Sequence, residues 1–437
     1  MTMSNLKKIS MPLAIMLMAS TAAACSGTGP AKETGGNVSE KPAASKDPVE
    51  IIFYSPLAPR TVEQFMKERG DDIQAKFPNY KIKFIPYAKG TETADLIAAG
   101  QTVDIIMSTT TTINELVKHG LQYDMTELIK KHKYDLNRLE PSLVQFMKEY
   151  SEGGMYGLPV SVSTFNLAYN KSVFDKFGVA YPKEGMTWDE VYELSKKLTR
   201  TEGGVQYYGL TMSVPHMLNI NQLSAPYYDP KTNKVLLEED KFKAVVSNYA
   251  RFYQLAGDKA GDLITQWQNY FVKDQTAAMM VYYASFTLET KFDFDWDVIS
   301  MPYFKEAMGV APQYTPSYME IAANSKHKDE AFEVLAYLTS DEYQMKQSRQ
   351  GIMTSLNNPG VKNAFAQGSD ILKGKNIKAY APEKAALITP KDQLSGIAGA
   401  KATSIFKNIV TGQSDINTAL RDAAEAARKE IETARVK

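Results

Sequence analysis

Strand-like and helical segments alternate at the start of the folded region, and this alternation constrains the fold most strongly. Residues 61–77 and 91–100 have the apolar spacing of helices, and Thr61 with Gln64 forms a capping-box pattern. The β-type runs before, between and after them are Val49–Ser55, Lys81–Tyr87 and Val103–Ser108. This order predicts right-handed βαβ units and a parallel sheet.

Ligands of such sheets bind beyond the carboxyl ends of the strands. This rule points to Tyr54 and Ser55, and to the loop Ser108–Thr112. Serine and threonine also cap helices and bond to nearby backbone. For Ser108–Thr112, a role in starting the next helix is therefore an equally supported alternative.

The rest of the chain continues the α/β pattern. Gly153–Val179 combines a Gly-Gly turn, a proline-bearing strand and a polar Ser-Val-Ser-Thr stretch, which is typical of a crossover between lobes. Thr187 and Glu190 form a second capping box, with Trp188 in a structural position at the helix start. Phe271–Phe286 predicts a turn followed by a buried strand.

The first residues predict a secretory leader that is not part of the fold. Residues 1–24 contain a basic start, an apolar run and small residues, and they precede Cys25, the one cysteine among 437 residues. The small residues before Cys25 resemble a bacterial lipobox, with Ala22 where leucine is usual. The resemblance implies cleavage before Cys25 and lipidation, and a plain signal peptide is the alternative. Residues 26–48 are rich in Gly, Ser, Pro, Lys and Glu and predict a flexible tether.

Composition excludes several classes of function. The formal net charge is zero, which gives no electrostatic footprint for nucleic acid. One cysteine excludes an intramolecular disulfide and a multi-thiolate metal site. The 4 histidines lack metal-ligand spacing, and no nucleophile elbow or phosphate loop is present. We therefore expect no metal and no cofactor. A glycoside hydrolase needs only two carboxyls and stays open as an alternative.

Three segments carry a resemblance to a known family. They contain "YGLPVSVSTFNLAYNKSVFDKFGV", "FVKDQTAAMMVYYASF" and "IAANSKHKDEAFEVLAYLTSDEYQ". In this order they resemble the extracellular solute-binding proteins of ABC importers, in the sugar-binding, maltodextrin-binding-like group. The resemblance implies a periplasmic-binding-protein-like α/β fold, with two lobes, a hinge and a ligand cleft between the lobes.

The resemblance also implies a domain division and three crossings between the lobes. We expect crossings near Val160–Thr164, Ala311–Tyr314 and Ile352–Ser355. The expected division is a signal peptide at 1–24, a lipidated cysteine and tether at 25–48, lobe 1 at 49–160 with 313–352, and lobe 2 at 161–312 with 353–437.

A sugar cleft needs short polar side chains for hydroxyl groups and aromatic faces for the apolar side of the ring. Each candidate also has an ordinary structural alternative, namely turn chemistry for Ser and Thr, and packing for His216, Trp267 and the tyrosines. Tyr282 and Tyr283 alternate along a strand, so at most one should face the cleft. The predicted ligand residues are Tyr54, Ser55, Ser108, Thr109, Ser163, Thr164, His216, Asn219, Trp267, Tyr283, Ser285, Tyr314 and Tyr318.

By this resemblance the chain is a monomeric, lipid-anchored and non-enzymatic binding protein on the outer face of the bacterial plasma membrane. It would deliver a sugar or oligosaccharide to the permease subunits of an ABC importer. A different small polar solute, or a surface-anchored carbohydrate-active enzyme, are the alternatives.

Overall fold

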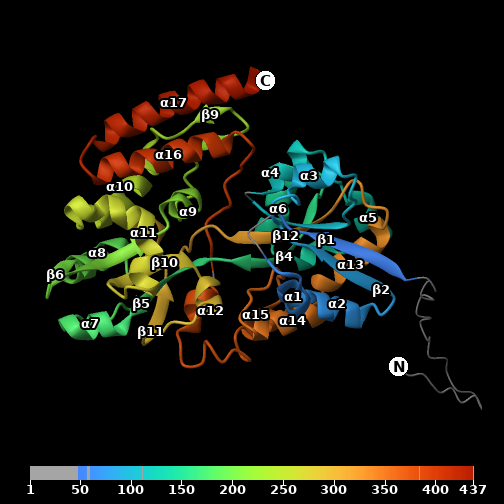
Figure 1. Ribbon diagram of the computed structural model, residues 1–437, viewed down its shortest axis with the longest axis horizontal. Coiled ribbons are helices and arrows are strands. Elements are labelled where there is room, and N and C mark those ends of the chain that lie inside the picture. Colours follow the sequence, from blue (N-terminus) through green and yellow to red (C-terminus); the bar gives the residue numbers. More distant parts are fainter. Residues whose placement is uncertain (1–47, 57–59, 111, 383, 437) are drawn as a thin grey trace, which may run out of the picture. The chain divides into compact units, whose positions relative to one another are not determined.

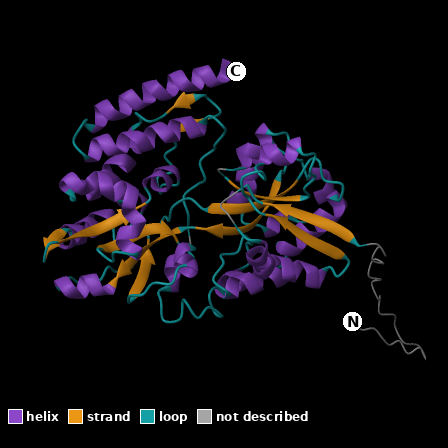
Figure 2. Ribbon diagram, in the orientation of Figure 1, coloured by secondary structure: helices purple, strands orange, loops and turns teal. Residues whose placement is uncertain are grey.

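The structure is a computed structural model that describes residues 48–56, 60–110, 112–382 and 384–436. Cys25 and the predicted leader and tether, apart from Pro48, lie outside the described residues. Two five-stranded sheets organise the described chain, and helices pack around each of them (Figures 1 and 2). We call each sheet with its helices a lobe.

The sheet of lobe 1 has the strand order β2-β1-β3-β12-β4. β1 pairs in parallel with β2 and β3, which confirms the predicted βαβ arrangement. β12 is antiparallel to both β3 and β4, so its start lies at the same edge as the ends of the other strands. The strands are β1 (Val49–Tyr54), β2 (Tyr80–Ile85), β3 (Ile105–Thr109), β4 (Gly157–Ser163) and β12 (Thr315–Ile321).

The sheet of lobe 2 has the order β11-β5-β10-β7-β6. β10 is antiparallel to β5 and parallel to β7, so the start of β5 and the ends of β7 and β10 share one edge. The strands are β5 (Phe165–Asn170), β6 (Arg200–Glu202), β7 (Val205–Met212), β10 (Ala277–Tyr283) and β11 (Trp296–Ser300). A small ribbon pairs β8 (Tyr228–Asp229) with β9 (Lys234–Val235).

Helices from several parts of the chain complete both lobes. Those of lobe 1 are α1 (Val62–Phe65), α2 (Asp71–Lys76), α3 (Thr93–Ala98), α4 (Ile113–Lys118), α5 (Thr126–Lys131), α6 (Pro141–Tyr150), α13 (Lys328–Leu338), α14 (Asp341–Arg349) and α15 (Pro359–Asn363). Those of lobe 2 are α7 (Lys171–Phe177), α8 (Trp188–Leu198), α9 (Val214–Asn219), α10 (Asp240–Gln254), α11 (Ala260–Val272), α12 (Phe286–Glu289), α16 (Ser395–Val410) and α17 (Ile416–Val436).

Both predicted capping boxes are present. Thr187 and Glu190 exchange hydrogen bonds at the start of α8, as Thr61 and Gln64 do at the start of α1. The helix predicted over 61–77 is interrupted, because a π turn separates α1 from α2. Local capping chemistry thus determines where these helices begin. The spacing of the apolar residues in 61–77 does not predict the π turn between α1 and α2.

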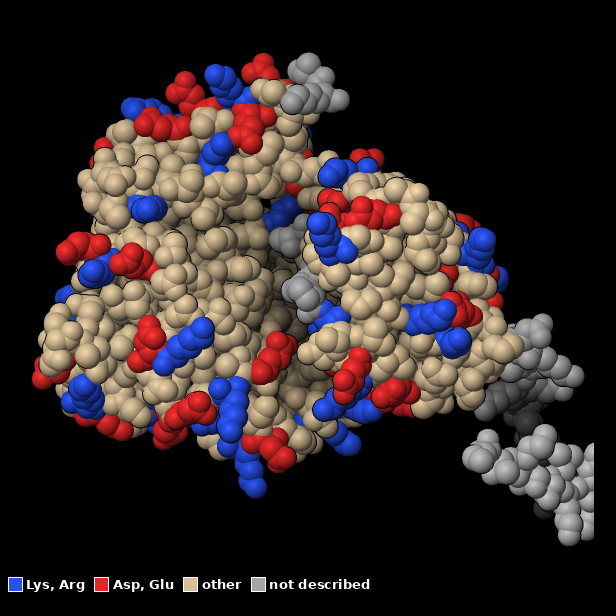
Figure 3. Space-filling model, viewed as in Figure 1, with Lys and Arg blue, Asp and Glu red and all other residues tan. Residues whose placement is uncertain are grey.

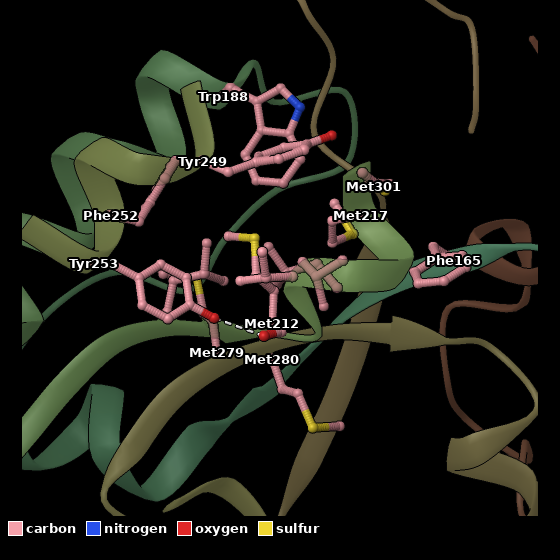
Figure 4. Close-up of a cluster of buried hydrophobic side chains, with 14 of the residues drawn as sticks. Phe165, Trp188, Met212, Met217, Tyr249, Phe252, Tyr253, Met279, Met280 and Met301 are labelled. Atoms are coloured by element: carbon pink, nitrogen blue, oxygen red, sulfur yellow. Dashed lines mark hydrogen bonds between the residues drawn. The ribbon is translucent and has the colours of Figure 1, made fainter. Parts of the chain in front are cut away.

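Each lobe has its own hydrophobic core. In lobe 2, Trp188 is buried, as predicted, against the rings of Tyr249 and Phe252 at 5.3 and 5.6 Å between centroids (Figure 4). The hydroxyl of Tyr253 donates to the Met212 carbonyl at 2.6 Å, which ties α10 to β7. The larger core therefore joins helices and sheet through polar as well as apolar contacts.

The predicted domain division stays a prediction, and the packing differs from it at two places. Val162 lies in β4 of lobe 1, and Leu356 and Val361 pack in the core of lobe 1. Phe365 packs in the core of lobe 2. The chain therefore enters lobe 2 after α15, later than the crossing expected at Ile352–Ser355, because α15 packs against α14.

Candidate ligand-binding site

A pocket of about 800 Å³ lies between the lobes, and we call it the interlobe pocket. The space-filling view shows the surface hollowed between the two lobes (Figure 3). Lobe 1 contributes Pro56, Tyr87, Glu92, Thr93, Ala94, Thr110, Thr112, Asn114, Glu115, Lys118 and His119. Lobe 2 contributes Tyr227, Lys391, Asp392, Gln393, Ser395 and Gly396.

The lobe 1 wall is built by the loops that follow its parallel strands. The hydroxyl of Tyr54, at the end of β1, shares a 3.2 Å hydrogen bond with the hydroxyl of Thr93 at the start of α3. After β3, the backbone N–H of Thr109 donates to the Thr112 hydroxyl at 2.9 Å, which closes a tight turn before α4. The pocket lies beyond the carboxyl ends of these strands, where the sequence predicts that a ligand binds.

The lobe 2 wall depends on a tyrosine packed against a glycine. The hydroxyl of Tyr227 donates to Asn219 Oδ1 at 2.7 Å, and burial raises the pKa of Tyr227 to about 12. A Cβ atom at Gly399 in α16 would lie 2.9 Å from Cζ of the Tyr227 ring. A side chain larger than that of glycine at position 399 would therefore require the Tyr227 ring or the helix to shift.

Two exposed contacts join the lobes beside the pocket. Gln393 Nε2 donates to the Asn114 carbonyl at 3.4 Å, and Lys231 Nζ lies 3.5 Å from a carboxylate oxygen of Glu149. An exposed ion pair such as that between Lys231 and Glu149 contributes little to stability, about 0–1 kcal/mol.

A second group of predicted residues meets at the end of β10. The ring of His216 lies 5.6 Å from that of Tyr282 and 5.1 Å from that of Tyr283, so both tyrosines contact it. Trp267 packs on Tyr282 at 4.7 Å, and Ser213 binds His216 Nδ1 at 2.7 Å. Burial lowers the pKa of His216, which keeps the imidazole neutral at neutral pH. We call these five residues the His216 cluster.

Other predicted residues use their polar groups inside the protein. Tyr318 is fully buried in the core of lobe 1 and donates to the Leu143 carbonyl at 2.9 Å. The hydroxyl of Ser108 donates to the buried carboxyl of Glu320. Asn219 accepts from Tyr227, and the hydroxyl of Tyr314 donates to the Pro382 carbonyl at 3.2 Å. Tyr314 lines a second pocket of about 760 Å³, together with Val162 and Met353.

The remaining candidates lie at or near the connections. Ser55 and Thr164 are buried, and Ser163 donates weakly to the Thr164 carbonyl at 3.4 Å. Ser285 precedes α12 and Thr109 ends β3. Their roles as ligand residues stay predictions.

None of the thirteen predicted ligand residues lines the interlobe pocket, although the predicted loop Ser108–Thr112 contributes Thr110 and Thr112. Its loops were predicted at the right strand ends, but Tyr227 and the segment Lys391–Gly396 were not selected. One local signal was available, because Asp392 and Ser395 exchange hydrogen bonds in the turn that leads into α16. That pattern predicts a helix start, and it does not predict that the start faces the other lobe.

Comparisons with known proteins identify relatives of the chain. A family model described as bacterial extracellular solute-binding protein matches residues 58–345, more than half of the chain. The arabinooligosaccharide-binding protein of Bacillus subtilis (strain 168) is 27% identical over 214 residues, which are 47% of this chain and 47% of that protein. The match thus spans about half the length of this curated relative.

Solved structures of low sequence identity share the fold. An ABC substrate-binding protein of Listeria monocytogenes, in complex with cycloalternan, aligns with a TM-score of 0.69 at 17% identity over 88% of this chain and 100% of that chain. The sugar-binding protein MalE of Xanthomonas citri aligns with a TM-score of 0.66 at 18% identity over 89% and 98% of the two chains. The two-lobed α/β fold expected from the sequence is therefore confirmed.

Proposed function

Because this chain belongs to the family of bacterial extracellular solute-binding proteins, we propose that it is the substrate-binding component of an ABC importer. The solute is a sugar or a short oligosaccharide, which binds between the lobes. The observation that carries this proposal is the interlobe pocket, where loops of two separate lobes face one another. A solute that contacts both walls stabilises a closed arrangement, which a membrane transporter can distinguish from the open one.

The lining of the pocket supports a sugar over an apolar solute. Hydroxyl and amide side chains supply hydrogen-bond donors and acceptors, namely those of Thr93, Thr110, Thr112, Asn114, Gln393 and Ser395. Tyr87 and Tyr227 add aromatic faces suited to the C–H side of a sugar ring. The names of related structures include cycloalternan and MalE, and the curated relative is named for arabinooligosaccharides.

Binding without catalysis is the second part of the proposal. Among the carboxylates of the pocket, Glu115 is hydrogen-bonded to His119 at 2.8 Å, and Asp392 accepts from Ser395. A glycosidase needs two carboxyl groups that flank the scissile bond, and we expect that Glu92, Glu115 and Asp392 do not provide such a pair. Release of product from an oligosaccharide, abolished by replacement of a pocket carboxylate, would contradict this part.

A thermal-shift screen over mono- and oligosaccharides tests the function, with Tyr227→Ala as the diagnostic variant. A bound sugar at 100 times its Kd should stabilise the wild type by about 2.7 kcal/mol. Loss of the Tyr227 ring should weaken binding about 10-fold, because a stacked aromatic face contributes about 0.5–1.5 kcal/mol.

Tyr181→Ala is the matched control, since Tyr181 is exposed and packs on Tyr169 near the far end of β5. Tyr283→Ala, in the His216 cluster, distinguishes the two candidate walls. Equal affinity of wild type and Tyr227→Ala would remove the interlobe pocket as the site, whereas weakened binding by Tyr283→Ala alone would place the sugar at the His216 cluster.

We also propose that Cys25 carries the lipid anchor, which holds the protein at the outer face of the membrane through the tether. None of the helices in the described residues is long and apolar enough to cross a bilayer. More than one acyl chain is needed for stable attachment. Mass spectrometry of the mature N-terminal peptide should find an acylated Cys25, and Cys25→Ala should release the protein from membranes. An unmodified thiol at the mature N-terminus would contradict the anchor.

A further inference from the structure

One lysine in the interlobe pocket differs from every other cation of the described chain. Lys391 is 9% exposed, and no other described lysine or arginine is buried to this degree. Lys391 lies in the segment between Ala385, which forms a β-bridge with Ala311, and the start of α16. Its position at the junction of the lobes places a buried ammonium group in the wall of the pocket.

The ammonium group has little compensation from the protein. Lys391 Nζ donates to the hydroxyl of Thr389 at 3.3 Å, and that hydroxyl donates to Gln313 Oε1 at 3.0 Å. No described carboxylate forms an ion pair with Lys391. An ammonium group has three donors, and burying it without a counter-ion costs free energy.

The other charged groups that line the pocket have partners or lie in solvent. Glu115 interacts with His119 and Lys118, at 2.8 and 3.8 Å. Asp392 Oδ1 accepts from the backbone N–H and the hydroxyl of Ser395. Glu92 and Lys118 are exposed. Lys391 is thus the buried charge of this wall that lacks an opposite charge.

The start of α16 adds to the positive character of the same wall. Ser395 and Gly396 form its first turn, and both line the pocket. A helix N-terminus favours negative charge, although Asp392 already accepts a hydrogen bond from the backbone N–H of Ser395 there. Lys391 and the start of α16 thus both contribute positive charge to this wall.

Given the proposed function, we propose that Lys391 is the counter-ion for a carboxylate of the solute, so that the protein selects an acidic saccharide, a uronic acid or a uronate-bearing oligosaccharide. The ammonium–carboxylate contact is a charge-assisted hydrogen bond, stronger than a bond from the same donor to a sugar hydroxyl. The carboxylate of the solute then supplies the negative charge that Lys391 lacks as a partner in the folded chain.

The acid–base behaviour of Lys391 agrees with this role. Burial lowers the pKa of Lys391 to about 8, so the group is still largely protonated at neutral pH. A bound carboxylate favours the protonated form and raises the pKa. Binding of an acidic saccharide should therefore weaken as the pH rises above about 8. Glu92, Glu115, Lys118, His119 and Asp392 face the same pocket, so the pH profile must be compared with that of the variant.

The experiment uses matched probes and one diagnostic variant. Wild type and Lys391→Met are titrated calorimetrically with digalacturonate and galactobiose, and with glucuronate and glucose. The wild type should bind the acidic member of a pair about 10- to 100-fold more tightly, and Lys391→Met should remove that preference. Methionine fills the volume without a charge, so the variant should melt no lower than the wild type. Lys196→Met, at an exposed ion pair on α8, is the control and should keep the preference.

The outcomes separate this inference from the proposed function. Neutral sugars bound as tightly as their acidic partners, or an acid preference that persists in Lys391→Met, would overturn the inference and leave sugar binding standing. Binding of no saccharide by the wild type, in these pairs or in the wider screen, would overturn both. If Lys391→Met does not fold, the wild-type preference and its loss above about pH 8 decide the question.

Discussion

Glu320→Gln should abolish a fall in stability that the wild type shows between about pH 5 and pH 8. Glu320 lies in β12, is 1% exposed, and has a pKa raised to about 8 by burial. One carboxyl oxygen accepts from Ser108, and the other has no hydrogen-bond partner among the described residues. The neutral acid is therefore the form that the fold prefers.

The sign of this pH dependence follows from whether the folded or the unfolded state keeps the proton on Glu320. Between the ordinary pKa near 4.5 and the folded value near 8, the folded state holds a proton that the unfolded state has lost. The stability that Glu320 contributes is fully present below its pKa in the unfolded chain. It is lost as the pH rises through its pKa in the folded protein. The free energy of unfolding should fall by on the order of 3–5 kcal/mol across this range.

Urea unfolding at pH 5 and pH 8.5 measures this difference. Glutamine keeps the shape and cannot ionise, so the advantage of Glu320→Gln over the wild type should grow with pH. Tyr150, Tyr156 and Tyr318 face the same carboxyl and stay protonated over this range. Glu193→Gln, at an exposed site of α8, is the control. Parallel pH curves for wild type and Glu320→Gln would show that Glu320 ionises normally in the fold.

Trp188→Ala should destabilise lobe 2 by about 3–5 kcal/mol, the usual cost of removing a buried tryptophan. The ring packs against Tyr249, Phe252 and Phe304, and its N–H donates to Gln222 Oε1 at 3.0 Å. The change leaves a cavity and an unpaired buried amide oxygen, and the second effect adds to the first.

The same amide connects the core to a crossing between the lobes. Gln222 Nε2 donates to the Val310 carbonyl at 2.9 Å, just before the chain returns to lobe 1. Thermal and urea unfolding should show the loss in Trp188→Ala, while Trp188→Phe, which keeps most of the packing, should lose less. A variant with wild-type stability would mean that the cluster in Figure 4 can close around the missing ring.

Much of the fold could be predicted because its determinants are local. The alternation around Val49–Ser55 predicted the parallel strands, and the side chains of Thr61 and Thr187 predicted the two helix starts. Each depends on residues only a few positions apart. The segment that became β10 was recognised in the same way, since seven consecutive residues of this strand are apolar or aromatic.

The site was harder to predict because its determinants are distant in the sequence. Tyr227 reaches the pocket through a contact with Gly399, and Lys391 through the pairing of Ala385 with Ala311. Conversely, Ser108 lies at the end of β3 as expected, but its hydroxyl donates to the buried carboxyl of Glu320. The strand end predicts the loop, whereas the direction of each side chain depends on partners from elsewhere.

Thr164 alone separates β4 of lobe 1 from β5 of lobe 2, and this has a mechanical consequence. The Ala284 N–H holds its carbonyl at 2.8 Å, so the lobe 2 side of the joint is clamped. The returning segment is braced in turn by Gln313, which donates to the Asn221 carbonyl and accepts from Thr389. We therefore expect any change in the angle between the lobes to be concentrated in the few residues between these hydrogen bonds and the sheet of lobe 1.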